Sequence, residues 1–159
     1  MKLTTVLGTV AATAATALIG SIASRDVDSR WYRKLRKPDF QPPAAVFPVV
    51  WTTLYADIAV TSAITIDELT ERGAAEERRN YVGALVANLV LNGAWSWVFF
   101  KGHRPVAATV VAALLSASSV DLARRTASTN PVAGLALAPY PVWTSFATLL
   151  SGRIAQLDR

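Results

Sequence analysis

The chain has 159 residues, of which 52% are hydrophobic and 17% charged, with a formal net charge of +5 and no cysteine. An average soluble domain carries roughly 25% charged residues, and the absence of cysteine excludes disulfides and thiol chemistry. The charges fall in short clusters, and none occurs within residues 3–24, 40–56, 80–100, 105–120 and 126–152. Because about 20 apolar residues cross the hydrocarbon core of a bilayer, this pattern predicts an all-α membrane protein and not a soluble bundle with a charged outer face.

The first apolar segment, residues 3–24, follows Lys2 and ends in small residues, as a secretory signal peptide does. It exceeds the usual apolar core of a signal peptide, roughly 7–15 residues, so we expect a first membrane span. A basic loop follows. Its prolines Pro38, Pro42 and Pro43 fix φ and lack N–H donors, so we expect a stiff, folded, lid-like loop and no continuous helix.

Four more spans are expected, at about residues 43–66, 80–100, 105–122 and 131–154. The second, fourth and fifth of the five spans begin at prolines, which a helix tolerates in its first turn. The acidic segment 67–79 is expected to be a short exposed connection around Gly73, and residues 101–105 a tight turn. The chain is thus predicted to be one domain, residues 1–159, formed by a bundle of five transmembrane helices.

The loop charges predict an orientation in the membrane. The side with the first loop, the third loop and the C-terminus holds ten of the 16 Lys and Arg residues. By the positive-inside rule, the N-terminus lies outside and the C-terminus in the cytoplasm. The same rule explains the net positive charge without a nucleic-acid partner. Helical bundles of this kind favour the bacterial plasma membrane over the outer membrane.

Aromatic rings and amide side chains share helical faces inside the spans. Trp51 and Tyr55 are one turn apart in the second span, and Asn88, Asn92 and Trp95 share a face of the third. Amides in hydrocarbon face the bundle interior, where they bond either neighbouring helices or a ligand. A mostly apolar cavity with a few polar groups is the usual design of a small-molecule site. Rings alone are also typical of an interfacial belt.

Three segments carry a family resemblance: WYRKLRKPDFQPPAAVFPVVWTTLY at residues 31–55, NLVLNGAWSWVFF at 88–100 and APYPVWTSFATLL at 138–150. They resemble the TspO/MBR family of translocator proteins, also called tryptophan-rich sensory proteins or peripheral-type benzodiazepine receptors. The resemblance implies five transmembrane helices, commonly a homodimer, and a porphyrin- and sterol-related pocket closed by the first loop. Gly152 stands where mammalian members carry the tyrosine of a sterol-recognition pattern, which weakens the sterol role.

The residues and the resemblance together predict a porphyrin-type ligand, with no required cofactor and no metal site. Sterol-like and benzodiazepine-type ligands are further expectations from the resemblance. The expected ligand-binding residues are Trp31, Tyr32, Phe40, Phe47, Trp51, Tyr55, Asn88, Asn92, Trp95, Tyr140, Trp143 and Phe146. The carboxylates of the ligand are expected to meet three cations of the lid, Arg33, Lys34 and Lys37.

We expect a role in tetrapyrrole transport, sensing or stress response. One alternative is an enzyme that degrades porphyrin in light, for which the resemblance implicates Trp51 and Trp143. A second alternative is a small proton-coupled transporter built around Asp57 in the second span, although this carboxylate could also pair across helices.

The third span carries the small residues Gly83, Ala84 and Ala87, which permit close approach of another helix. With the resemblance, this face predicts a homodimer through the third span. The same pattern also serves packing within one chain, so from the residues alone both uses stay open.

Overall fold

The computed structural model describes residues 1–25 and 29–158, and their regular structure is helical. The helices are α1 (Leu3–Ser24), α2 (Arg30–Lys34), α3 (Val46–Glu71), α4 (Ala75–Ser96), the π-helix η2 (Trp97–Lys101), α5 (Pro105–Thr129), α6 (Pro131–Leu137) and α7 (Pro139–Leu157). Since η2 continues α4 and α7 follows α6 directly, five helical segments of the described chain are long and apolar enough to cross a membrane. The predicted all-α membrane bundle is thereby confirmed.

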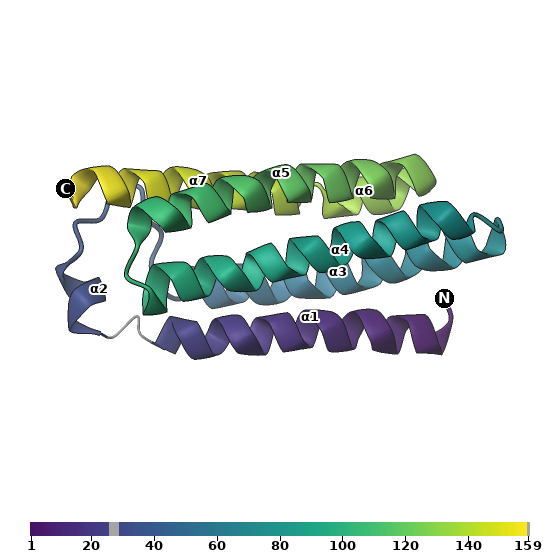
Figure 1. Cartoon of the computed structure of the whole chain (residues 1–159), viewed down its shortest axis with the longest axis horizontal. Coiled ribbons are helices and arrows are strands. Elements are labelled where there is room, and N and C mark those ends of the chain that lie inside the picture. The colour runs from purple at the N-terminus through teal and green to yellow at the C-terminus, as the bar shows by residue number, and fades with distance from the viewer. Residues whose placement is uncertain (26–28, 159) are drawn as a thin grey trace.

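The long helices lie side by side, with α2 and the C-terminus at one end and the N-terminus and the α3–α4 turn at the other (Figure 1). Helix α5 packs along α7 and α4, while α1 packs on α3 and α4. The buried face of α1 is formed by small and hydroxyl-bearing residues, which let helices approach closely in a membrane. They are Thr9, Thr13, Thr16, Gly20 and Ala23.

The acidic segment 67–79 holds an exposed connection around Gly73, as predicted, but this connection is much shorter than the sequence indicated. Helix α3 continues to Glu71 and α4 already begins at Ala75, so the turn between them is only three residues long. Gly73 in this turn has φ 69°, a left-handed conformation that glycine adopts without steric cost after a helix. Charged residues can continue these helices because the ends of a span extend beyond the hydrocarbon. For the same reason α5 continues to Thr129, beyond the predicted end at residue 122.

Asp67 lies in this reassigned segment, and only 5% of its surface is exposed. Its carboxylate accepts a hydrogen bond of 2.6 Å from the backbone N–H of Lys2 and one of 2.7 Å from the hydroxyl of Thr5. The first N–H groups of a helix have no partner within it, and a negative side chain there is favoured by the helix dipole. Asp67 therefore caps the start of α1 from α3.

Helix α6 approaches α5 very closely at Gly134. Asn130 caps α6 by accepting a hydrogen bond of 3.0 Å from the N–H of Ala133, and its amide donates to Glu68 at 2.6 Å. A Cβ atom added to Gly134 would lie 2.4 Å from the Cα of Ala127. Only glycine therefore fits at this crossing without movement of the α5 backbone.

Candidate ligand-binding pocket

A cavity of about 520 Å³ lies between α1, α3, α4, η2 and α7, beneath the lid helix α2. Seven ring side chains line it: Tyr32, Phe47, Trp51, Tyr55, Trp95, Phe99 and Phe100. Its polar lining groups are fewer: Ser21, Ser24, Arg25, Thr52, Ser96 and Ser151. This size and this mixture are typical of small-molecule sites, which span roughly 300–1,000 Å³.

Trp51 is the centre of the aromatic wall. Its ring centroid lies 5.8 Å from that of Tyr55, 6.4 Å from that of Trp95 and 6.2 Å from that of Trp143. The indole N–H of Trp95 donates to the hydroxyl of Ser151 at 3.1 Å, which fixes the orientation of this ring. The helical face predicted from Trp51 and Tyr55 thus does line a cavity.

The π-helical turn η2 brings two adjacent residues, Phe99 and Phe100, to the same cavity. In this turn the N–H of Gly102 donates to the carbonyl of Trp97, five residues earlier, at 2.8 Å. The wider turn changes the direction of the side chains that follow. Neither phenylalanine was among the predicted ligand-binding residues, because a regular helix of 3.6 residues per turn points neighbours about 100° apart.

The lid helix α2 packs its rings on η2 and on the turn that follows it. Ser29 caps α2 by accepting a hydrogen bond from the N–H of Tyr32 at 3.2 Å. Trp31 stacks on His103 with a centroid distance of 4.2 Å, and Tyr32 contacts Phe100 at 5.6 Å. Of the two rings, Tyr32 lines the cavity and Trp31 does not. The described part of the first loop, from residue 29 onward, is therefore a folded lid, although α3 begins only at Val46, and residues 26–28 of the loop lie outside the described residues.

The three lid cations predicted to meet carboxylates do not line the cavity. Arg33 and Lys34 are exposed, while the ammonium of Lys37 donates to the carbonyl of Tyr32 at 2.7 Å and lies 4.3 Å from the centre of its ring. Burial lowers the pKa of Lys37 below its ordinary value and raises the pKa of the Tyr32 phenol above its own. The cation that lines the cavity is Arg25, which the sequence analysis did not select.

A chain of hydrogen bonds leads from the cavity wall into the bundle. The hydroxyl of Tyr55 donates to the Oδ1 of Asn92 at 2.7 Å, and the amide of Asn92 donates to the hydroxyl of Tyr140 at 3.0 Å. Tyr140 in turn donates to Asn88 at 2.6 Å, and the amide of Asn88 donates to Ser119 at 3.1 Å. Of these residues only Tyr55 lines the cavity, so the two asparagines bond neighbouring helices here.

Comparison with known proteins decides the family. Residues 8–157 match the model of the TspO/MBR family. The chain belongs to the TspO/MBR family. It is 33% identical over 140 residues to "Tryptophan-rich protein TspO" of Chlorobaculum tepidum, covering 87% of this chain and 86% of the relative. It is 33% identical over 122 residues to the Homo sapiens "Translocator protein", covering 77% and 71%. It is also 30% identical over 132 residues to "Uncharacterized membrane protein YtaB" of Bacillus subtilis, covering 83% of each.

Family membership confirms the predicted resemblance. With the five apolar helices, it identifies an integral membrane protein.

In this TspO/MBR protein, three further predicted residues form an aromatic group beside the cavity wall. Phe40 contacts Phe146 at a centroid distance of 6.1 Å, and Trp143 contacts Phe146 at 5.3 Å and Phe47 at 5.8 Å. None of Phe40, Trp143 and Phe146 lines the cavity. The indole N–H of Trp143 is buried and has no hydrogen-bond partner within the described residues. It remains a donor available next to Trp51.

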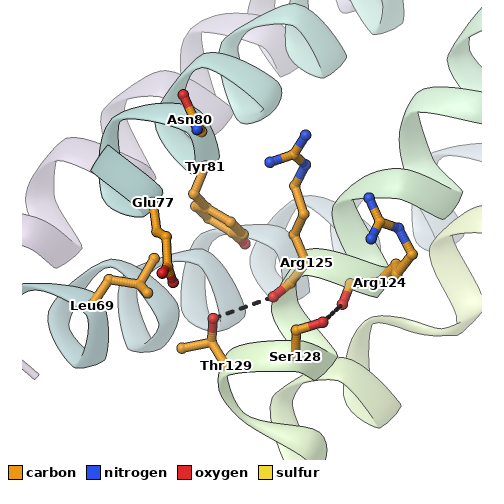
Figure 2. A pocket seen from close by; sticks show the side chains of 8 residues that line it. All are labelled: Leu69, Glu77, Asn80, Tyr81, Arg124, Arg125, Ser128 and Thr129. Carbon is orange, nitrogen blue, oxygen red and sulfur yellow. Dashed lines mark hydrogen bonds between the residues drawn. The ribbon is translucent and has the colours of Figure 1, made fainter. Parts of the chain in front are cut away.

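A second, smaller pocket of about 220 Å³ lies between the end of α3, the start of α4 and the end of α5 (Figure 2). Its lining is largely polar or charged: Leu69, Glu77, Asn80, Tyr81, Arg124, Arg125, Ser128 and Thr129. The two arginines bond the carboxylate of Asp121, each at 2.8 Å. This pocket suits a flat apolar molecule less well than the larger cavity, which is therefore the candidate site of the TspO/MBR protein.

Proposed function

We propose that this TspO/MBR protein binds a porphyrin-type tetrapyrrole in the large cavity and acts in tetrapyrrole transport, sensing or stress response. The aromatic wall of the cavity, with Arg25 at its edge, carries the proposal. A tetrapyrrole is flat and largely apolar, so its face can stack on rings such as Trp51. Its carboxylates can form charge-assisted hydrogen bonds with a guanidinium. The same apolar space supports sterol-like or benzodiazepine-type ligands as further candidates.

Titration with protoporphyrin in the dark tests this proposal. We expect saturable quenching of tryptophan fluorescence by the wild-type protein in detergent or vesicles. Trp51→Ala should weaken the affinity about tenfold, equivalent to about 1.4 kcal/mol, because it removes the central ring of the wall. Trp51→Phe, which keeps a ring, should lose less. The Kd is read from the ligand concentration at half-saturation and so does not depend on the number of fluorophores.

Two variants outside the cavity serve as matched controls. Val110→Ala truncates an apolar side chain on α5 that is 57% exposed and does not line the cavity. Asp57→Asn alters a half-buried residue on the same helix as Trp51 that also lies outside the lining. Both should bind protoporphyrin as the wild type does. Quenching that never saturates, or an unchanged Kd in Trp51→Ala, would contradict the proposal.

Light-dependent porphyrin degradation is a second candidate function. Trp51 lines the cavity, and Trp143 meets it edge-on with a centroid distance of 6.2 Å. An excited porphyrin could transfer one electron to molecular oxygen, and the porphyrin radical cation and superoxide so formed would combine, with both oxygen atoms ending in the opened macrocycle. The two neighbouring indoles could prolong the life of the radical cation by reversible exchange of one electron with it. Under illumination the same titration would then show loss of porphyrin absorbance that requires both tryptophans. If Trp51→Phe and Trp143→Phe each lost porphyrin absorbance as fast as the wild type does, this activity would be excluded.

A proton-coupled transporter built around Asp57 has less support. Asp57 does not line the cavity. The hydroxyl of Thr61 donates a hydrogen bond of 2.7 Å to the backbone carbonyl of Asp57 and not to its carboxylate. Retention of all measured activities by Asp57→Asn would rule out this form of the transporter.

We further propose a homodimer through α4. Gly83 and Ala87 are exposed and Ala84 is half-buried, so the small-residue face is free in the protomer. A Cβ at Gly83 would meet no atom within 4 Å. Gly83→Leu should therefore leave the protomer intact but separate the dimer, as measured by size-exclusion chromatography with light scattering. The control is Gly8→Leu on α1, where the surroundings are equally empty. A dimer that survives Gly83→Leu would place the interface elsewhere.

The loop charges support an orientation with the N-terminus outside the bacterial plasma membrane and the lid end in the cytoplasm. At the lid end, the described residues Arg30, Arg33, Lys34 and Arg36 are all exposed.

A further inference from the structure

The residues that line the cavity differ in exposure from helix to helix. Those contributed by α4 and α7 are buried: Trp95, Ser96, Leu150, Ser151 and Ile154. The exposed ones lie at or next to the end of α1 and the start of α3: Ser21, Arg25, Ala44, Pro48 and Thr52. The opening of the cavity therefore lies between α1 and α3.

Both helices that flank this opening are membrane spans. The side chains around it are apolar and exposed: Leu18 is 62% exposed, Ile22 38% and Val49 67%. Thr52 follows the first residue of α3 by six positions, which at 1.5 Å per residue is about 9 Å along the helix. The opening therefore extends toward the hydrocarbon region, with Arg25 at its outer edge, where α1 ends.

The other sides of the cavity are closed by specific contacts. The indole N–H of Trp97 donates to the carbonyl of Ile19 at 3.0 Å and holds α1 against η2. On the same side, a Cβ at Gly20 would lie only 3.4 Å from the hydroxyl oxygen of Ser96. At the end of the bundle, the ring of Tyr32 packs on Phe99 and Phe100. The wall toward α4 and the lid are thus closed, whereas the side between α1 and α3 is not.

We infer that ligands enter and leave the cavity sideways from the bilayer, through the opening between the end of α1 and the start of α3. We name this opening the α1–α3 portal, and the inference rests on the proposed ligand site. It specifies the ligand class: an amphiphile dissolved in the membrane, whose apolar body passes at the depth of Thr52. An acidic group on that ligand would stay near the headgroups, within reach of Arg25. Hydrocarbon excludes a ligand that is charged throughout.

The absence of native cysteine makes the portal directly testable. Thr52→Cys places a single thiol on the exposed lining, and Thr53→Cys places one on the adjacent exposed residue that does not line the cavity. Each protein is reconstituted in vesicles and modified with a bulky methanethiosulfonate reagent, which dithiothreitol removes. Vesicles that contain protoporphyrin are then mixed in, and tryptophan quenching is followed over time.

With the adduct at position 52 we expect the association and dissociation rates to fall together by at least about tenfold, and to recover after reduction. The adduct at position 53 should change neither rate. Unchanged rates at position 52 with saturable binding would overturn the portal and leave the proposed function standing. A slower association without slower dissociation would also overturn it, because the adduct would then only compete for the cavity. Without saturable binding in the wild type, both proposals fail.

A second measurement tests the portal without a ligand. A fluorescent label on Ser21→Cys should be quenched by lipids that carry a nitroxide on the acyl chain, because Ser21 is exposed between two membrane spans. A water-soluble nitroxide should quench it much less. Stronger quenching by the water-soluble nitroxide than by the lipid nitroxide would show that the opening faces water and would overturn the inference.

Discussion

Gly134→Ala is expected to lower the free energy of unfolding by about 1–3 kcal/mol, the usual cost of overpacking. The added Cβ would lie 2.4 Å from both the Cα and the Cβ of Ala127 and 2.8 Å from its backbone nitrogen. Relief requires movement of the α5 backbone, which also packs on α4 and α7. The measurement is the thermal unfolding midpoint of the purified protein in detergent, followed by circular dichroism.

Gly8→Ala on α1 is the matched control for this prediction. It makes the same chemical change inside a helix, but a Cβ at Gly8 meets no atom within 4 Å. Alanine is favoured over glycine in a helix by about 0.8–1.0 kcal/mol, so this variant should unfold at the wild-type temperature or above it. An equal loss of stability in both variants would show that the α5–α6 crossing is not the cause.

Asn92→Leu is expected to destabilise the protein by about 1–2 kcal/mol. Leucine has the same branched shape and number of heavy atoms, but it leaves the Tyr55 hydroxyl without its acceptor at 2.7 Å and the Tyr140 oxygen without its donor at 3.0 Å. Hydrogen bonds between transmembrane helices contribute on average about 0.6 kcal/mol each. A buried polar group without a partner costs about 1–3 kcal/mol. Thermal or denaturant-induced unfolding in detergent measures the total loss of stability from the missing hydrogen bonds and the unpaired groups.

A double-mutant cycle separates the stranded hydroxyl from the loss of packing. Tyr55→Phe combined with Asn92→Leu should recover part of the lost stability, because the unpaired phenol is gone. The control is Tyr55→Phe alone, which strands only the acceptor of Asn92. If the double variant loses the full sum of the two single losses, the bond between these residues contributes nothing to the stability of the bundle.

The number and nature of the spans followed from the sequence because a charged side chain is costly in hydrocarbon. Each long interval without charge therefore marks one crossing of the membrane. The ends of the spans did not follow, since charge is tolerated where a helix leaves the membrane. Asp67 shows the difficulty most clearly. From sequence it belongs to an acidic surface turn, yet the structure buries it against α1.

The cavity was predictable in part. The spacing of Trp51 and Tyr55 gave a shared face, and both line the cavity. The spacing of Asn88 and Asn92 gave a shared face too, but periodicity within one helix does not say which neighbour that face meets. Here it meets Tyr140 on α7, so the amides serve the bundle. Serines of α1 went unnoticed because small residues carry little signal of their own.

The hydrogen bonds between the Asp67 carboxylate and the start of α1 affect how the protein folds during synthesis. The two partners of the first of these bonds, Lys2 and Asp67, are 65 positions apart in the chain. A ribosome adding roughly 5–20 residues per second needs several seconds to make that stretch. Throughout this interval the first amides of α1 can be satisfied only by water and lipid headgroups. Helix α1 is therefore secured by this contact only after the end of α3 has been synthesised.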